Sequence, residues 1–283
     1  MQLLINGLIV GAILAVSTMG LTLTVKILGF FNFAHGTMMT IGAYAAFSFN
    51  VTLGLPFPLS VILAVPVGIG VALIFDRLVY VRMREAGPVP LLMTGIGVMF
   101  VLRSLVRLAY GSQIRFYDLP IMPGHRLLGA SITTTQIIVI GLSVGIIFLT
   151  HLFLTRTKIG RTMRAVAGNP RLSEIVGVDS DKVYIWTWAV ASSLAVISGV
   201  FLAYDTRLVP EMGWNFLIPV FVAMVLGGIG SIYGAALGGF IVGLAMEVSA
   251  GFIPPTYKLA VAFIIMAIVL FYKPTGLFAE VVE

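Results

Sequence analysis

The stretch MQLLINGLIVGAILAVSTMGLTLTV, residues Met1–Val25, contains no Asp, Glu, Lys or Arg. A helix needs roughly 20 apolar residues to cross the hydrocarbon core of a bilayer, so this stretch is long enough to span a membrane. Four further intervals lack these charged residues, and each can hold at least one span: Ile27–Phe75, Leu127–Thr155, Val183–Tyr204 and Met212–Met246. The sequence therefore predicts an all-α, polytopic membrane protein.

The composition agrees with this fold class. The chain is 59% hydrophobic and 10% charged, whereas soluble domains are about 45–50% apolar and about 25% charged. Its net charge of +6 is better explained by basic residues that anchor cytoplasmic loops than by nucleic-acid binding. The absence of cysteine excludes disulfides, thiolate metal sites and cysteine nucleophiles. The N-terminus lacks the basic region and the cleavage site of a secretory signal.

The apolar stretches predict a helix bundle of eight or nine spans, forming a single membrane domain over residues 1–283. The proposed spans are Leu3–Val25, Phe33–Asn50, Phe57–Phe75, Leu91–Leu108, Thr135–Leu154, Val183–Tyr204, Phe216–Gly230, Ala235–Ala250 and Leu259–Tyr272. With residues 154–183 placed in the cytoplasm, eleven of the 17 basic residues face that side. Nine spans then predict an external N-terminus and a cytoplasmic C-terminus. An eight-span arrangement with one re-entrant segment would change the side of the N-terminus.

The connection Leu154–Val183, LTRTKIGRTMRAVAGNPRLSEIVGVDSDKV, holds six of the 17 basic residues. It uses nearly 30 residues where about 2–8 would join two helices. Arg161 and Arg164 stand at i and i+3, on one face of a predicted helix. Such a face either binds lipid phosphates as part of a membrane-surface helix or is a docking surface for a cytoplasmic partner. We favour the docking surface.

The same loop contains the start and stop signals of two short helices. Thr157 can cap the first helix, which Asn169–Pro170 ends. Leu172–Val176 can form the second helix, which Gly177 stops. Asp179–Asp181 then caps the next span.

Four blocks of sequence resemble one known family, in the same order along nearly the whole chain. They are NFAHGTMMTIGAY (Asn32–Tyr44), TGIGVMFVLRSLVRLAYG (Thr94–Gly111), the loop just described, and VLGGIGSIYGAALGG (Val225–Gly239). The family is that of the branched-chain amino acid ABC transporter permeases, of the leucine/isoleucine/valine permease H subunit type. Its coupling loop carries T-x-x-G-R-x-x-R-A and then a G-[IV]-[DN] element. The matching positions here are Thr157, Gly160, Arg161, Arg164, Ala165 and Gly177, with Val178 and Asp179 after it.

Two places depart from the family pattern. Leu172–Glu174 stands where alanines are usual, which weakens any assignment of roles within the second short helix. Pro219–Phe221 stands where a Lys-Ala-Phe-like triplet is common, which bears on the identity of the cargo.

The resemblance implies a permease subunit of an ATP-driven importer in a prokaryotic cytoplasmic (inner) membrane. It implies two cytoplasmic ATPase subunits docked on the coupling loops, a second permease subunit that is a paralogue or a copy of this chain, and an extracytoplasmic substrate-binding protein. It implies no cofactor and no nucleic acid. The sequence itself contains no Gly-Lys pair and hence no Gly-x-x-x-x-Gly-Lys-Ser/Thr loop, so ATP hydrolysis must belong to another subunit.

Polar and glycine positions inside the predicted spans are candidates for the translocation pathway, because polar groups are costly in a membrane. These candidates are Asn32, His35, Gly36, Gly228, Gly230 and Glu247. Each has a structural alternative: capping of broken helix ends by Asn32 and His35, helix packing by the glycines, and an interfacial position for Glu247. His35 has no partner at metal-ligand spacing, so no metal site is expected. Arg103 and Arg107 are expected to extend to the external interface.

Three other functions compete with amino-acid import. A permease for urea or short-chain amides shares the same motifs. An ion-coupled secondary transporter would need intramembrane carboxylates, for which Glu247 is the candidate. An intramembrane enzyme would need His-Glu-x-x-His or Gly-x-Ser-x-Gly, and the chain has neither.

Overall fold

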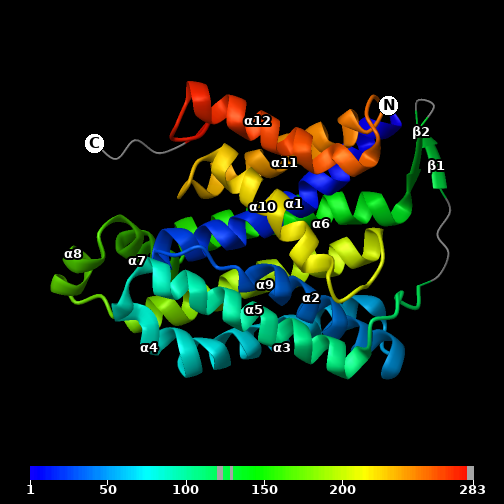
Figure 1. The fold of residues 1–283 in the computed structure, drawn as a ribbon. Helices are drawn as coiled ribbons and strands as arrows, with labels where there is room; N and C mark the ends of the chain where they lie inside the picture. The colour runs from blue at the N-terminus through cyan, green and yellow to red at the C-terminus, as the bar shows by residue number, and fades with distance from the viewer. Residues whose placement is uncertain (120–123, 128–129, 279–283) are drawn as a thin grey trace.

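A computed structural model describes residues 1–119, 124–127 and 130–278. The described chain is a bundle of long helices with one two-stranded hairpin (Figure 1). Seven segments are long and apolar enough to cross a membrane. They contain α1 (Gln2–Leu28), α3 (Phe57–Phe75), α5 (Pro88–Tyr110), α6 (Thr134–Arg156), α9 (Ser180–Asp205), α11 (Ile232–Ser249) and α12 (Lys258–Tyr272). The predicted fold class, a polytopic helical membrane protein, is confirmed.

Short helical segments extend or join these spans. α3 continues through a π-helix (Asp76–Tyr80), α4 (Val81–Met83) and a 3₁₀ turn (Arg84–Ala86), and a 3₁₀ turn (Pro255–Tyr257) precedes α12. The strands β1 (Gly124–Leu127) and β2 (Ala130–Thr133) pair antiparallel before α6. Each of the nine predicted spans overlaps a helix, although α2 and α10 are not among the seven long enough to cross a membrane.

Two of these helices, α2 (Ala34–Phe47) and α10 (Met212–Gly227), begin inside the bundle and pack against each other. α2 continues into a π-helical segment, Ser48–Thr52. The backbones of Gly36 and Gly213 are in direct contact, and Gly213 N donates to Thr40 Oγ1 at 3.1 Å. Twelve of the 14 residues of α2 are buried, so this helix forms the centre of the core.

Glycines bring the other central helices together. Gly11 of α1 lies against Gly243 of α11, and Gly199 of α9 lies against the backbone of Met39 in α2. Without a hydrophobic driving force in lipid, small residues that let backbones approach closely are a main source of helix packing.

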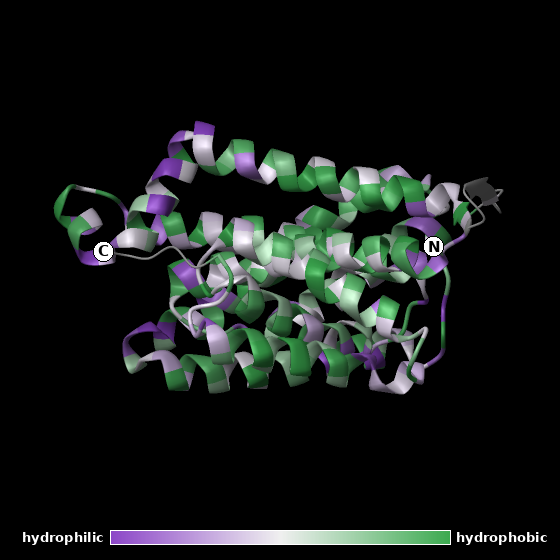
Figure 2. Ribbon diagram, turned by 90° about the horizontal axis from the view of Figure 1, so that it is seen from above, coloured by the Kyte–Doolittle hydropathy of each residue, from purple (hydrophilic) through white to green (hydrophobic). Residues whose placement is uncertain are grey.

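The bundle has two distinct ends. α7 (Lys158–Gly168) and α8 (Pro170–Ile175) protrude at one of them, which we call the coupling end, and the β1–β2 hairpin marks the other, the hairpin end (Figure 1). Residue Met1 lies at the hairpin end, where Ser131 N donates to Gln2 Oε1 at 3.0 Å. Hydrophobic residues occupy the middles of the helices, and hydrophilic residues gather mostly near the two ends (Figure 2).

Candidate functional site

The site predicted from the loop 154–183 is a rigid corner at the coupling end. α6 ends at Arg156 and α7 begins at Lys158, so Thr157 alone separates them. Its backbone is extended, and its hydroxyl donates to Phe153 O at 2.7 Å and accepts from Gly160 N at 2.9 Å. One side chain therefore closes the end of α6 and caps α7, as the sequence predicted for the cap.

The inner face of α7 is packed against the bundle. Gly160 lies directly on the last turn of α6, where a Cβ atom would overlap the carbonyl oxygens of Phe153 and Leu154. Met163 and Val166 are fully buried in a hydrophobic cluster with residues of α1, α6 and α9. α7 therefore shares a close-packed core with three spans.

The outer face of α7 and every residue of α8 except the buried Ser173 are exposed. Arg161, Arg164 and Ala165 face away from the bundle, and neither arginine forms an ion pair with any described residue. α8 and the residue that follows it add three exposed apolar side chains: Leu172, Ile175 and Val176. Ile175 is 81% exposed. Figure 1 shows α8 protruding beyond the end of the bundle, along the direction of the spans.

The turn after α8 has the geometry that its glycine predicts. Gly177 has φ +86°, a left-handed conformation that glycine adopts without a steric penalty. Val178 N donates to Ser173 O at 3.0 Å, which ends α8. Asp179 Oδ1 then accepts from Lys182 N at 3.1 Å and caps α9. The predicted end of the second short helix at Gly177 and the predicted cap of the next span at Asp179 are both confirmed.

A buried carboxylate connects α9 to α3 at the coupling end. Asp76 is 2% exposed and accepts from Arg84 Nη2 through both oxygens at 2.9 Å. Trp188 Nε1 of α9 donates to the same carboxylate at 2.8 Å. Arg84 also donates to Asp181 Oδ1 at 3.0 Å and lies over the ring of Tyr184, with 4.5 Å from Cζ to the ring centroid. The first turns of α9, which follow α8, are thus held to the end of α3.

This contact extends to the start of the central helix. The ring of Tyr80 lies 4.9 Å from that of Trp188, and its hydroxyl is 3.4 Å from Asn32 Oδ1. The same oxygen accepts from Ala34 N at 3.0 Å, so Asn32 caps α2. Sequence reasoning missed Asp76, Arg84 and Trp188. The available signal was a single carboxylate at the end of an apolar stretch with an arginine eight residues later.

The six pathway candidates do not come together in one place. Asn32 and His35 are buried, and His35 Nε2 lies 3.0 Å from Ser17 O. Gly36 packs on Gly213, as described above. Gly228 and Gly230 form the turn between α10 and α11 with positive φ angles, and Glu247 near the other end of α11 pairs with Lys258 Nζ at 2.6 Å. For these residues, lining a pathway stays a prediction.

The expectation for Arg103 and Arg107 needs a correction. Instead of extending to the interface on their own, both bind Glu211: Arg107 Nε is 2.7 Å and Arg103 Nη2 is 3.4 Å from Glu211 Oε1. The physical reason is that Glu211 precedes α10, which starts inside the bundle and so brings a carboxylate to the last turns of α5. No group of three metal-ligating side chains occurs in the residues that the structure describes.

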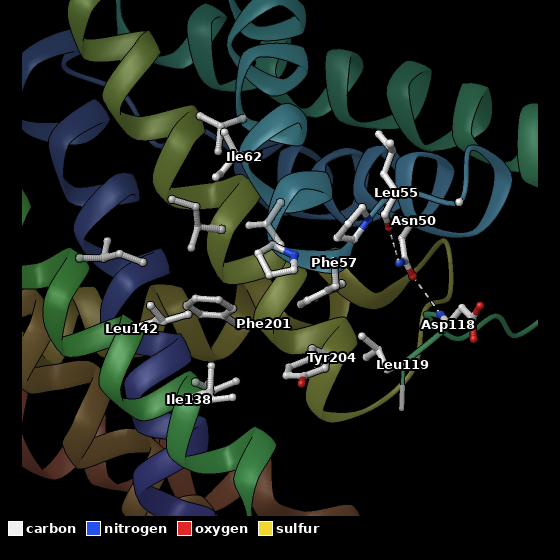
Figure 3. Close-up of a pocket in the computed structure, with 18 residues that line it drawn as sticks. Asn50, Leu55, Phe57, Ile62, Asp118, Leu119, Ile138, Leu142, Phe201 and Tyr204 are labelled. Carbon is white, nitrogen blue, oxygen red and sulfur yellow. Dashed lines mark hydrogen bonds between the residues drawn. The ribbon is translucent and has the colours of Figure 1, made fainter. Parts of the chain in front are cut away.

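A groove of about 750 Å³ runs between α3, α6 and α9 near the hairpin end. Its walls are apolar, including Ile62, Leu142 and Phe201 (Figure 3). At its rim, Asn50 Oδ1 accepts from Asp118 N at 2.9 Å. None of the predicted site residues lines this groove.

Comparisons with known proteins cover nearly the whole chain. A family model described as "Branched-chain amino acid transport system / permease component" matches residues 3–270. The high-affinity branched-chain amino acid transport system permease protein BraD of Pseudomonas aeruginosa is 32% identical, over 98% of this chain and 95% of its own. LivH of Escherichia coli K12, a permease protein of such a system, is 30% identical over 98% and 94%. A probable permease protein LivM of Methanocaldococcus jannaschii is 31% identical over 48% of this chain and 44% of its own.

One solved structure has a similar fold. It is titled "PsaBC from Streptococcus pneumoniae in complex with Fab" and superimposes with a TM-score of 0.53, over 97% of this chain and 93% of that chain. The sequences are 14% identical, so the likeness concerns the fold alone.

Proposed function

The chain belongs to the family of branched-chain amino acid transport permeases, and from this premise we propose that it is the membrane-spanning permease subunit of an ATP-driven importer of branched-chain amino acids. It forms part of the translocation pathway and couples to ATPase subunits that are separate chains. BraD and LivH are named as permease proteins of high-affinity branched-chain amino acid transport systems, and this chain covers more than nine-tenths of each.

The observation that carries the coupling role is the corner between α6 and α7. Thr157 and Gly160 fix α7 on the end of a span, while Arg161 and Arg164 point outward without ion-pair partners in the described residues. A partner that presents acidic side chains would bind these arginines, and the exposed apolar residues of α8 would add buried area. In this proposal Arg161, Arg164 and Ala165 form the docking surface for a cytoplasmic ATPase, and Thr157, Gly160 and Gly177 hold that surface in position.

Movement of this surface reaches the interior through two routes. α7 is continuous with α6 and shares a hydrophobic cluster with α1 and α9. Asp76 and Arg84, at the end of α3, then bind Trp188 and Asp181 of α9, and Tyr80 links the same end of α3 to the cap of α2. A conformational change driven by a partner requires contacts that differ between two states. A docking surface joined to α6, α1, α9 and α3 would transmit such a change to the interior.

The remaining partners follow from the same system. A second permease subunit completes the pathway, either a copy of this chain or a paralogue of the LivM kind, and an extracytoplasmic binding protein delivers the solute. The proposed location is the prokaryotic inner membrane, with the coupling end in the cytoplasm. Urea or short amides are the alternative cargo, and ATP-independent uptake would indicate a secondary transporter instead.

Charge reversal at Arg161 or Arg164 tests the docking role. We expect Arg161→Glu and Arg164→Glu to lower the copurification of the ATPase subunits and the solute-stimulated hydrolysis of ATP. Arg82→Glu is the matched control, because Arg82 is an exposed arginine at the same end that lies outside α7 and α8. If the two variants keep both properties at the level of the control, the surface does not bind the ATPase.

A further inference from the structure

A second group of charged side chains lies at the hairpin end, remote from α7 and α8. Its centre is Glu211, whose Oε1 accepts hydrogen bonds from Arg103 and Arg107 of α5. Arg115 lies in the connection that leaves α5, where its backbone pairs with that of Leu208 at 3.0 Å. The connection after α5 and the connection before α10 are far apart in sequence, and both lie beside this cluster.

Three buried hydrogen-bond donors in this cluster have no partner in the described part of the chain: Tyr44 OH, Arg103 Nε and Arg115 Nε. Among the described residues, one further buried side-chain atom, Ser143 Oγ, is in this condition. Tyr44 is 1% exposed, its ring lies 4.7 Å from that of Tyr110, and it interacts electrostatically with Arg115 and Glu211. Buried polar groups are nearly always hydrogen-bonded, so three unpaired donors in one cluster indicate that an acceptor binds there.

The charge of the cluster defines that acceptor. Arg103, Arg107 and Arg115 outnumber Glu211, and the unpaired Nε atoms of Arg103 and Arg115 can only donate, so an anion is the group that completes the cluster best. A carboxylate matches the planar donor pattern of arginine. Glu211 receives all its hydrogen bonds from the arginines on one oxygen, Oε1, so its other oxygen can accept from a cation.

A solute that carries both charges satisfies the two requirements together. The carboxylate of a zwitterion takes the place of Glu211 on an arginine, and its ammonium takes the place of the arginine on Glu211. The net charge of the cluster does not change in this exchange, whereas an anion or a cation alone would leave one partner unpaired in a poorly hydrated site.

An apolar surface adjoins the charged cluster. A groove of about 270 Å³ is lined by Val209 and Met212, which flank Glu211 in sequence, by Phe216 and Pro219 of α10, and by the charged Arg207. Asn215 also lines it, one helical turn after Glu211. An aliphatic side chain attached to a zwitterionic group at Glu211 would therefore reach an apolar wall.

We propose that Glu211, Arg103 and Tyr44 bind the main-chain end of an α-amino acid, with its carboxylate on Arg103 and Tyr44, its ammonium on Glu211 and its aliphatic side chain in the groove along α10. Arg107 and Arg115 add positive potential that attracts the carboxylate. This inference rests on the proposed import function and makes it more specific. Urea and short amides carry neither charge, so this cluster favours amino acids over that alternative cargo.

Uptake by the complete transporter in vesicles is the first test. We expect Glu211→Gln and Arg103→Gln to lower leucine uptake about tenfold or more, the loss expected when one charged hydrogen bond to the solute is removed. Asp118→Asn is the control, because Asp118 is an exposed acid in the same connection as Arg115 and is not part of the cluster. Unchanged uptake in both variants would overturn the site. Failure of the wild-type transporter to import leucine with ATP would instead overturn the proposed function.

Protection of a cysteine separates solute binding from a purely structural ion pair. The chain has no cysteine of its own, so Arg107→Cys, and Asn215→Cys as a second position, each present one thiol to a water-soluble sulfonate reagent. We expect leucine-loaded binding protein to slow labelling at both positions, and not at Asp118→Cys. Equal rates with and without leucine would overturn the proposal. So would equal slowing by unloaded binding protein, which would show that a docked protein covers the cluster.

Discussion

Gly160 lies where α7 crosses the end of α6 and has no space for a side chain, because a Cβ would overlap two backbone carbonyl groups of the preceding helix. Gly160→Ala must therefore push α7 away from α6. We expect a loss of about 1–3 kcal/mol in the free energy of unfolding, as for overpacking elsewhere. We also expect solute-stimulated ATP hydrolysis to fall. Thermal unfolding of the purified permease and ATPase assays of the complete transporter measure the two effects.

Gly168, the last residue of the same helix, provides the control. It has no atom within 4 Å of the position of a Cβ. Gly168→Ala should therefore leave hydrolysis unchanged and stability equal or higher, by at most about 0.5–1 kcal/mol. If Gly160→Ala behaves like Gly168→Ala, α7 is not held against α6 as the structure indicates.

The attachment of α9 to α3 depends on Asp76, which gives the next prediction. Asp76→Asn keeps an acceptor for Trp188 but removes the charge that binds Arg84, so we expect a loss of about 2 kcal/mol in the free energy of unfolding. If the pair transmits motion, ATP hydrolysis will persist while leucine uptake falls, because the docking surface is intact and its link to the interior is not.

Asp181→Asn is the comparison for this variant. Asp181 binds the same arginine, but its side chain is 84% exposed, and exposed pairs contribute about 0–1 kcal/mol. Uptake and stability close to those of the wild type are expected. Equal effects of the two substitutions would indicate that burial of the pair does not matter, contrary to the role given to Asp76.

The sequence predicted the parts of this architecture that depend on neighbouring residues. The length of the apolar stretches predicted the spans. Short-range signals predicted the boundaries of α7 and α8, because Thr157, Gly177 and Asp179 act within three to five residues of their hydrogen-bond partners. The ion pairs could not be predicted, because Arg84 meets Asp181 and Arg107 meets Glu211 across about 100 residues of sequence. Such pairs depend on how the helices pack, and in particular on α10 beginning inside the bundle.

The arrangement of the bundle predicts which side of the membrane each connection faces. Residues 118 and 257 lie toward the hairpin end, and residues 182 and 273 lie toward the coupling end. Because the natural chain contains no cysteine, single cysteines at these positions report their side without background labelling. We expect an impermeant maleimide to label Asp118→Cys and Tyr257→Cys in intact cells, and Lys182→Cys and Lys273→Cys after permeabilisation of the membrane.

This labelling pattern also tests whether α12 crosses the membrane. Helix α12 joins Tyr257 to Lys273, so a crossing by α12 requires different sides for these two residues. Labelling of both in intact cells would make α12 or a neighbouring helix re-entrant, and the number of crossings would become even. Labelling of Lys182→Cys in intact cells would have a larger consequence. It would place Arg161 and Arg164 outside the cell, where no ATP-hydrolysing subunit can reach them, and the coupling role of α7 and α8 would have to be abandoned.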